Sequence, residues 1–123
     1  MKRQTLQRRA IRESLEVAGR PLSAQEVLES AQDQVSNLGI ATVYRNLKAL
    51  VDEGFLCLVD LPGEPSRYEL AAQGHHHHFQ CRGCERVFDV RGCFKALEQN
   101  LPAGFVAEDH EVVIYGRCAD CTT

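Results

Sequence analysis

Three features are missing from this chain of 123 residues, and each absence excludes a class of protein. No apolar run approaches the roughly 18 residues that a membrane-spanning helix needs. Residues 1–7 have no apolar stretch behind their charges, as a secretory signal would, so we expect a cytoplasmic protein. No carboxylate is clearly placed beside an open metal position, so we expect neither a zinc hydrolase nor a thiol oxidoreductase, and no small-molecule substrate.

The chain also lacks an excess of positive charge, since its formal net charge is −3. This value argues weakly against a nucleic-acid partner, but the basic residues are concentrated at one end. A local basic patch is what phosphate binding requires, and Arg8 and Arg9 are its candidates. A solvated helix face explains the same charges equally well. The charged residues of segment 1–20 are Lys2, Arg3, Arg8, Arg9, Arg12 and Arg20 against Glu13 and Glu16.

Histidine is absent from residues 1–70, which contain the single cysteine Cys57, whereas residues 75–121 contain all the histidines and the remaining cysteines. Cytoplasmic cysteines stay reduced, so pairs of them are better interpreted as metal ligands or redox groups than as disulfides. The change of composition near Gly74 predicts a first domain over 1–70, a hinge over 71–74 and a second domain over 75–123.

The first domain has the pattern of a winged helix-turn-helix. Apolar residues at helical spacing predict a first helix that ends at Gly19 and a third helix over 40–51. Between them, Ser23 to Glu26 form a capping box that opens a second helix. Segments 55–61 and 67–70 are predicted strands around a turn. Three short helices and a two-stranded wing would present the third helix to the DNA major groove.

The polar face of this third helix offers side chains that read bases. Arg45 can bond bidentately to guanine, Asn46 can read adenine, and Tyr44 can pack on a thymine methyl or bond a phosphate. A polar helix face without a partner is the alternative. The candidate DNA-contacting residues are Thr42, Tyr44, Arg45 and Asn46, with Arg8 and Arg9 on the first helix.

Two C-x-x-C pairs frame the second domain, and between them we predict a strand over 86–90, a helix near 94–99 and a strand over 111–115. A two-residue spacer lets both thiolates of a pair face one ion at about 2.3 Å, and two pairs complete a tetrahedron. With no open position, the site would be structural. A redox C-x-x-C is the competing interpretation, but it needs only one pair. The four predicted zinc ligands are Cys81, Cys84, Cys118 and Cys121.

The run of four histidines before the first pair is predicted to enter a β-strand, where side chains alternate between faces. His76 and His78 then point one way, and His75 and His77 point the other, so each face gains a pair of imidazoles. A polar loop is the alternative. Glu69 and Cys57 are candidates to join the first pair, and Cys93 and His110 the second. The remaining carboxylates, which we expect at the surface, are Asp89, Glu98, Glu108 and Asp109.

Together these motifs resemble the ferric uptake regulator superfamily over nearly the whole chain, most of all its zinc uptake regulator (Zur) branch. The fold that this implies is α+β: an N-terminal winged helix-turn-helix followed by a small α/β dimerisation domain with a four-cysteine zinc site. The family also implies a homodimer that binds palindromic double-stranded operator DNA when metal-loaded. The matching segments are 22–26, 39–47, 67–70, 75–78 with Cys81 and Cys84, and 113–118.

The resemblance assigns the metal sites residue by residue. It places the structural zinc on Cys81, Cys84, Cys118 and Cys121. The hinge sensing site falls on Glu69, His76 and His78, and in some zinc-type members also on the position of Cys57. A third site falls on His75, His77 and His110, with an acidic ligand expected near Cys93. The family's DNA-contacting pair falls on Tyr44 and Arg45.

Three departures from the iron-type pattern favour zinc. Pro21 stands at or near the position of a histidine ligand, Cys57 is available to replace it, and Cys93 stands where a carboxylate is usual. Soft thiolates with imidazoles suit zinc better than ferrous iron. Cys93 could equally be a small buried apolar residue. We therefore predict a zinc-responsive repressor with structural and regulatory Zn²⁺. The alternatives are an iron-responsive repressor and a zinc-buffering protein that does not bind DNA.

Overall fold

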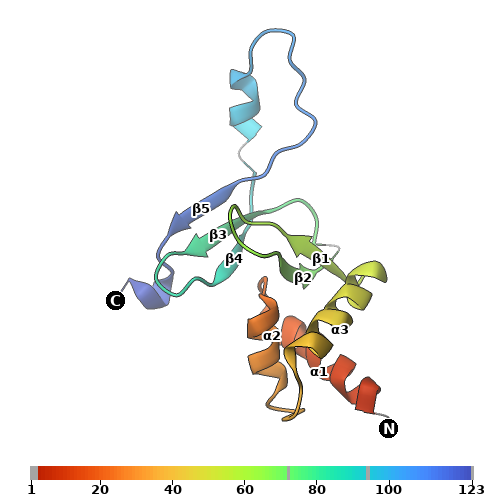
Figure 1. Ribbon diagram of the computed structural model, residues 1–123. Coiled ribbons are helices and arrows are strands. Elements are labelled where there is room, and N and C mark those ends of the chain that lie inside the picture. Colours follow the sequence, from red (N-terminus) through yellow and green to blue (C-terminus); the bar gives the residue numbers. More distant parts are fainter. Residues whose placement is uncertain (1–2, 72, 94, 123) are drawn as a thin grey trace. The chain divides into compact units, whose positions relative to one another are not determined.

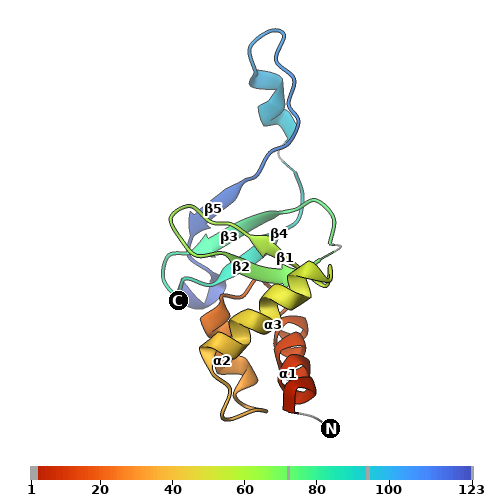
Figure 2. The ribbon, with the colours of Figure 1, turned by 45° about the vertical axis from the view of Figure 1, so that its right-hand side comes forward.

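The computed structural model describes residues 3–71, 73–93 and 95–122, in two compact units, Met1–Gln73 and Gly74–Thr123 (Figures 1 and 2). The division falls in the predicted hinge, 71–74. Of the residues singled out above, Lys2 and Phe94 lie outside the described residues, as does the side chain of Arg3. Among the described residues, no helix is long and apolar enough to cross a membrane.

The first unit contains the three predicted helices, α1 (Arg3–Ala18), α2 (Ala24–Ala31) and α3 (Ile40–Asp52). Helix α2 opens with the predicted capping box. The Ser23 hydroxyl accepts the Glu26 backbone N–H at 3.1 Å, and the Glu26 carboxylate accepts the Ser23 backbone N–H at 3.0 Å. After α3 the chain turns at Gly54, whose φ of 82° is a left-handed conformation that glycine adopts easily.

Two antiparallel strands complete this unit, β1 (Leu56–Val59) and β2 (Arg67–Leu70). Backbone hydrogen bonds between Leu22 and Tyr68 join β2 to the start of α2. The apolar faces of helices and strands meet in one core. Leu6 and Ile40, near the N-terminal ends of α1 and α3, lie on the apolar faces of these helices but are 45% and 39% exposed. The core consists of Ala10, Ile11, Leu15, Leu22, Ala24, Val27, Ala31, Leu38, Val43, Leu47, Leu50 and Leu56.

The second unit is a three-stranded sheet in the order β4-β3-β5. Strand β3 (His77–Cys81) pairs antiparallel with β4 (Val87–Val90) and parallel with β5 (Val113–Gly116). The α+β class is as predicted. The predicted helix appears as the 3₁₀ helix η1 (Lys95–Asn100), and a second 3₁₀ turn, η2 (Ala119–Cys121), was not foreseen.

Within this unit, η1 and the segment that follows it stand away from the sheet (Figures 1 and 2). We call residues 95–112 the arm. Three of its apolar side chains face solvent: Leu101 is 41% exposed, Phe105 66% and Val106 84%. A chain seldom leaves large apolar side chains this exposed over one short segment unless another surface covers them.

Candidate metal sites and nucleic-acid face

The two C-x-x-C pairs converge at one end of the second unit. The first pair ends β3 and begins the turn to β4, and the second flanks η2 after β5. Because β5 runs parallel to β3, the C-terminal ends of both strands, each with its pair, lie at the same end of the sheet. The sulfurs of Cys81, Cys84, Cys118 and Cys121 lie within 4.8 Å of one another.

The spacing of these sulfurs fits a tetrahedral ion. Sulfurs at about 2.3 Å from one zinc lie about 3.8 Å apart. Cys84 Sγ and Cys118 Sγ are 3.8 Å apart, and none of the four cysteines of this cluster is in a disulfide. A Cβ added at Gly83 would come within 2.9 Å of Cys121 Sγ, so glycine is needed there for the close approach.

Hydrogen bonds prepare this cluster to bind a cation. Three backbone N–H groups, those of Cys118, Cys84 and Gly83, donate to Cys81 Sγ at 3.3, 3.4 and 3.3 Å. They lower the pKa of Cys81 to about 5 although the residue is buried. The pKa of Cys121 is raised to about 12, because its S–H donates to Cys81 and lies among the other sulfurs. The Cys121 proton thus lies among sulfurs that carry negative charge, and a bound cation would neutralise the same charge.

Sequence reasoning missed Arg86, which contacts this cluster from just before β4. Its Nε donates to Cys84 Sγ at 3.1 Å, and its Nη2 donates to Cys118 Sγ at 3.6 Å and to Asp120 at 2.9 Å. The pKa of Cys84 is lowered chiefly by this guanidinium. No motif indicates the role, since an arginine two residues after a C-x-x-C pair is not in itself distinctive.

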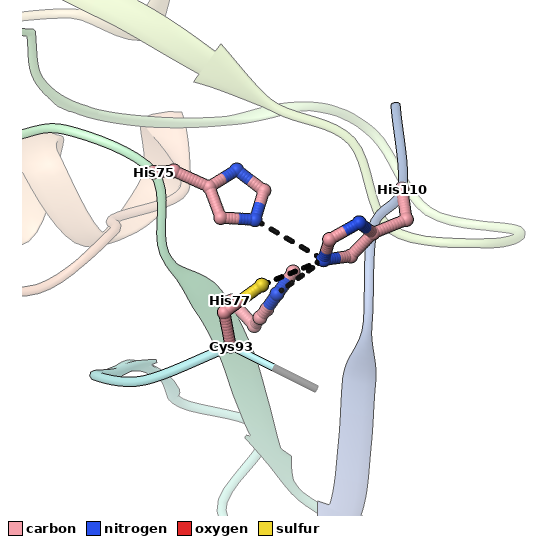
Figure 3. Close-up of side chains that lie close together, drawn as sticks. All are labelled: His75, His77, Cys93 and His110. Atoms are coloured by element: carbon pink, nitrogen blue, oxygen red, sulfur yellow. Dashed lines mark hydrogen bonds between the residues drawn. The ribbon is translucent and has the colours of Figure 1, made fainter. Parts of the chain in front are cut away.

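A second cluster forms where β3 begins, shown in Figure 3. His75, His77 and Cys93 all point toward Nε2 of His110, at 3.2, 3.1 and 3.0 Å. The four donor atoms lie within 4.8 Å of one another. Cys93 is exposed, so the alternative that it is a buried apolar residue is wrong. The four donor atoms therefore converge as ligands do around one cation.

Groups outside this cluster orient its rings. Glu98 accepts from His110 Nδ1 at 2.9 Å, which leaves His110 Nε2 as the unprotonated nitrogen that faces the cluster. His77 Nδ1 accepts the Val112 backbone N–H at 3.2 Å. His77 is buried, and burial with the neighbouring histidines lowers its pKa. Glu98 was expected at the surface, and its side chain is 38% exposed, but it also orients the His110 ring.

A third cluster lies on the opposite face of the histidine run, as the predicted alternation requires. His76 Nε2 and His78 Nε2 lie 3.3 and 3.5 Å from Asp89 Oδ1, and Gly74 O accepts from His76 Nδ1 at 2.9 Å. Asp89 was expected at the surface, but its side chain is only 10% exposed. The reason is register: Asp89 is the partner of His78 across the β3–β4 pair, which places both side chains on one face.

In the first unit, Cys57 and Glu69 are direct partners across the β1–β2 pair. Side chains of opposed residues point to the same face, about 4.5–5.5 Å apart at Cβ. Glu69 is 3% exposed and Cys57 is partly buried. A carboxylate and a thiol thus stand side by side on one face of the wing, and both can bind a metal.

The predicted DNA-reading residues lie on helix α3, opposite its core face. Tyr44 is 49% exposed and Arg45 is exposed. Thr42 holds its two neighbours on the face: its hydroxyl accepts from Arg45 at 3.0 Å and its carbonyl from Asn46 at 2.9 Å. A polar cleft of about 430 Å³ separates α3 from α1. Its lining residues are Thr5, Gln7, Arg8, Thr42, Arg45 and Asn46.

Three basic residues of α1 form contacts within the first unit. Arg8 forms an ion pair with Glu53, and Arg9 forms one with Glu13 at 3.2 Å. The Arg12 guanidinium lies 4.1 Å from the centre of the Phe55 ring. Exposed ion pairs of this kind contribute at most about 1 kcal/mol, so a phosphate can displace the carboxylates.

The chain thus joins a winged helix-turn-helix unit to a small α/β unit that gathers cysteines and histidines into clusters. The sequence profile of the ferric uptake regulator family matches residues 2–115, and the chain belongs to this family.

Known relatives carry the names of several metals. The ferric uptake regulation protein of Campylobacter jejuni is 34% identical over 88 residues, which is 69% of this chain and 56% of that relative. The chain thus matches little more than half of that relative's length. A zinc-bound manganese uptake regulator superposes with a TM-score of 0.80 at 28% identity, over 96% of this chain and 89% of the other. FurB of Mycobacterium tuberculosis, a zinc uptake regulator, gives 0.54 at 32% identity, over 97% and 95%.

Proposed function

We propose that this protein is a zinc-responsive transcriptional regulator that binds a palindromic DNA operator as a homodimer and represses genes of zinc uptake. The observation that carries the choice of zinc is the cluster in Figure 3, where the Cys93 thiol joins three imidazoles. Thiolate and imidazole donors favour zinc over ferrous iron and manganese, which prefer oxygen and nitrogen donors. The similarity to zinc-bound and zinc-uptake regulators supports the same metal.

In this proposal the four cysteines hold a structural zinc. The 3.8 Å between Cys84 and Cys118 and the backbone hydrogen bonds to Cys81 support it. A site closed by four thiolates leaves no position for a substrate, which agrees with a protein that is not an enzyme. His75, His77, Cys93 and His110 form the further zinc site.

The sensing site draws on both units. Within the second unit His76, His78 and Asp89 supply three ligands, and within the first unit Cys57 and Glu69 share one face of the wing. We propose that ligands from both groups bind one ion. The sequence predicts this site on Cys57, Glu69, His76 and His78, and the contacts of Asp89 with the two histidines add a further candidate ligand. A bound divalent ion supplies a cross-link between the units. To change the linked form from a minor to a dominant population takes about 5.5 kcal/mol of differential binding, which is within the range of a zinc site.

Tyr44 and Arg45 carry the proposed DNA contact, with Arg8 and Arg9 at phosphates. The cleft between α1 and α3 places Arg8 and Arg45 in one lining. Recognition helices of a dimer enter successive major grooves about 34–36 Å apart. The exposed Leu101, Phe105 and Val106 of the arm support dimerisation, because a second copy would cover them.

The test begins with DNA selected from a randomised duplex pool in the presence of zinc. Fluorescence anisotropy of the selected duplex is then followed against buffered free Zn²⁺ and, without oxygen, against Fe²⁺. We expect binding to begin at very low free zinc and to weaken steeply with salt, because several arginines meet phosphates. Binding that responds to iron and not to zinc would make this an iron-type regulator.

Two variants separate the alternatives. Arg45→Ala should abolish sequence-specific binding and leave the zinc content unchanged; a zinc-buffering protein would select no duplex at all. Cys57→Ser should weaken zinc-dependent DNA binding while the four-cysteine site stays filled. Unchanged zinc dependence in Cys57→Ser would remove Cys57 from the sensing site and leave it to Glu69 and the second-unit ligands.

The iron-responsive alternative also has a structural observation in its favour. His76, His78 and Asp89 form a nitrogen and oxygen set, which ferrous iron accepts as readily as zinc. The deciding comparison is Cys93→Asp, which converts the cluster of Figure 3 to an imidazole and carboxylate set. In a zinc sensor this change should weaken zinc binding at that site and raise its relative affinity for Fe²⁺ and Mn²⁺.

A further inference from the structure

The hydrogen bonds to the four cysteine sulfurs are unequally distributed. Three backbone N–H groups donate to Cys81 Sγ. Cys84 and Cys118, which come from the two different C-x-x-C pairs, share the side chain of Arg86. One guanidinium therefore contacts both pairs. It joins two sulfurs that are 34 residues apart in the sequence and close together in the fold.

The guanidinium is fixed on three sides. Asp120, which lies between the two cysteines of the second pair, accepts from Nη2 at 2.9 Å. The Phe88 ring lies 5.6 Å from the guanidinium carbon, and the Arg86 side chain is 32% exposed. A planar fork held in this way can serve two acceptors at once, which a lysine ammonium cannot do with the same geometry.

The contact of Arg86 with the two sulfurs matters because the cluster is negatively charged. Four thiolates around a divalent cation leave a net charge of −2, and electron-rich sulfur is the atom that oxidants and competing electrophiles attack. A donor N–H on a thiolate reduces its nucleophilicity and stabilises it where it lies. The two sulfurs that receive Arg86 should therefore be the two whose reactivity depends on it.

We propose that Arg86 is a positioning residue that holds Cys84 and Cys118 in the four-cysteine site and protects these two sulfurs from electrophiles, so that the metal is retained. This inference rests on the proposed zinc site. In Arg86→Gln, zinc transfer to a chromophoric chelator should be about tenfold faster than in the parent protein, since a hydrogen bond to a charged group is commonly equivalent to a factor of this size.

The matched control is Arg82→Gln, which removes the same charge from the same unit. The Arg82 guanidinium lies over the Tyr115 ring, 5.0 Å from its centre. Zinc transfer from Arg82→Gln should proceed at the parent rate. Arg86→Lys keeps the charge but loses the fork, and its rate should lie between those of the parent and Arg86→Gln.

A second measurement separates positioning from general stability. The zinc-loaded full chain is treated with iodoacetamide, and each cysteine is quantified by mass spectrometry. In Arg86→Gln the alkylation of Cys84 and Cys118 should rise relative to Cys81 and Cys121. Asp120→Asn, at an exposed position, should produce the same pattern to a smaller extent, because it releases one side of the guanidinium.

The outcomes are distinct. If the purified parent contains no zinc at the four cysteines, the proposed site itself is wrong. If the parent contains zinc and Arg86→Gln matches Arg82→Gln in transfer rate, the role of Arg86 is overturned. Equal acceleration of alkylation at all four cysteines would also overturn it, since that is the result of a merely looser fold. If Arg86→Gln does not fold, Arg86→Lys and Asp120→Asn give the same readouts.

Discussion

The two units of this protein are stabilised in different ways. Among the described residues, every buried apolar side chain except Cys81 and Val87 belongs to the first unit. In the second unit the buried side chains include His77 and Gln80, and its cysteines and histidines form clusters. The first unit thus has an ordinary small apolar core. The second unit buries too little apolar surface to balance the loss of conformational entropy when its chain becomes ordered.

This difference shows how a metal-dependent protein can divide its stability. Each large apolar side chain that is buried contributes about 1.5–3 kcal/mol, so the first unit can fold on its core alone. The structural zinc proposed for the four cysteines would contribute about 10–16 kcal/mol of apparent binding free energy, in place of such a core in the second unit. Folding of the second unit, and not of the first, should therefore follow metal supply.

Removal of one zinc ligand should have the largest effect. Cys118→Ser breaks the proposed four-cysteine site, and we expect the second unit to lose its fixed structure while the first unit keeps its own. In a ¹H–¹⁵N NMR spectrum, amide peaks of residues 74–122 should collapse to the centre and those of the first unit should stay dispersed. Cys57→Ser is the control, since it removes a cysteine outside the four. A second unit that remains dispersed would show that it does not depend on this site.

Truncation in the core of the first unit should have the converse effect. Leu47 is 0% exposed, and Leu47→Ala should lower the free energy of unfolding of the first unit by about 2–5 kcal/mol. Zinc bound by the second unit should remain at the parent stoichiometry. Chemical denaturation followed by circular dichroism, with zinc measured on the same samples, tests both parts. Loss of zinc in step with loss of helix would mean that the units do not fold separately.

Acid should destabilise the second unit before the first. Burial and neighbouring histidines lower the pKa of His77 below its usual 6.5, so the unfolded chain takes up a proton first as the pH falls. The neutral ring's contribution to the second unit is therefore present above about pH 6.5 and is lost as the pH falls below it.

In the first unit, the titrating group to compare with His77 is Glu26. Burial alone would raise the pKa of Glu26, but the Ser23 backbone N–H and Arg20 hold it below its usual 4.5. Its stabilising effect is present above that value and is lost as the pH falls further. In an NMR pH titration, peaks of the second unit should therefore begin to change as the pH falls below about 6.5, before those of the first change below about 4.5. Simultaneous loss near pH 4 would contradict the separation.

The smallest effect is expected at the start of α2. Ser23→Ala removes the hydroxyl of the capping box and should lower the stability of the first unit by about 1 kcal/mol. Metal content and the spectrum of the second unit should not change. Ser36→Ala, at an exposed position between α2 and α3, is a comparison that leaves the helix cap intact. An equal loss in both variants would mean that the box contributes no more than an ordinary surface hydroxyl.

The sequence predicted the elements of the first unit well, because the periodicity of its apolar residues and the box at Ser23 are local signals. It also placed the histidines on alternating faces of β3, since alternation follows from strand geometry alone. The roles of Asp89 and Glu98 were missed. Both depend on partners distant in sequence, Asp89 through the β3–β4 register and Glu98 through the approach of His110, and no local pattern encodes such contacts.

Arg86 was missed for a related reason. Its contact with Cys118 exists only because β5 runs parallel to β3 and returns the second C-x-x-C pair to the first. The ligand types were visible in the sequence, whereas the groups that orient the ligands were not. Orienting groups are chosen by geometry, and many residue types at many positions can supply a single hydrogen bond.

The arm is a part of this chain whose length can change at little cost to the rest of the second unit. Cys93 and His110 lie in contact at its base, so the residues between them form a closed loop attached at one point. The entropic cost of such a loop rises by only about 0.6 kcal/mol for each doubling of its length. Insertions and deletions within 99–107 should therefore be tolerated by the ligand clusters, and they would alter mainly the surface that the arm presents. Such changes would alter the association of subunits that we propose for the arm and leave the residues of the clusters in place.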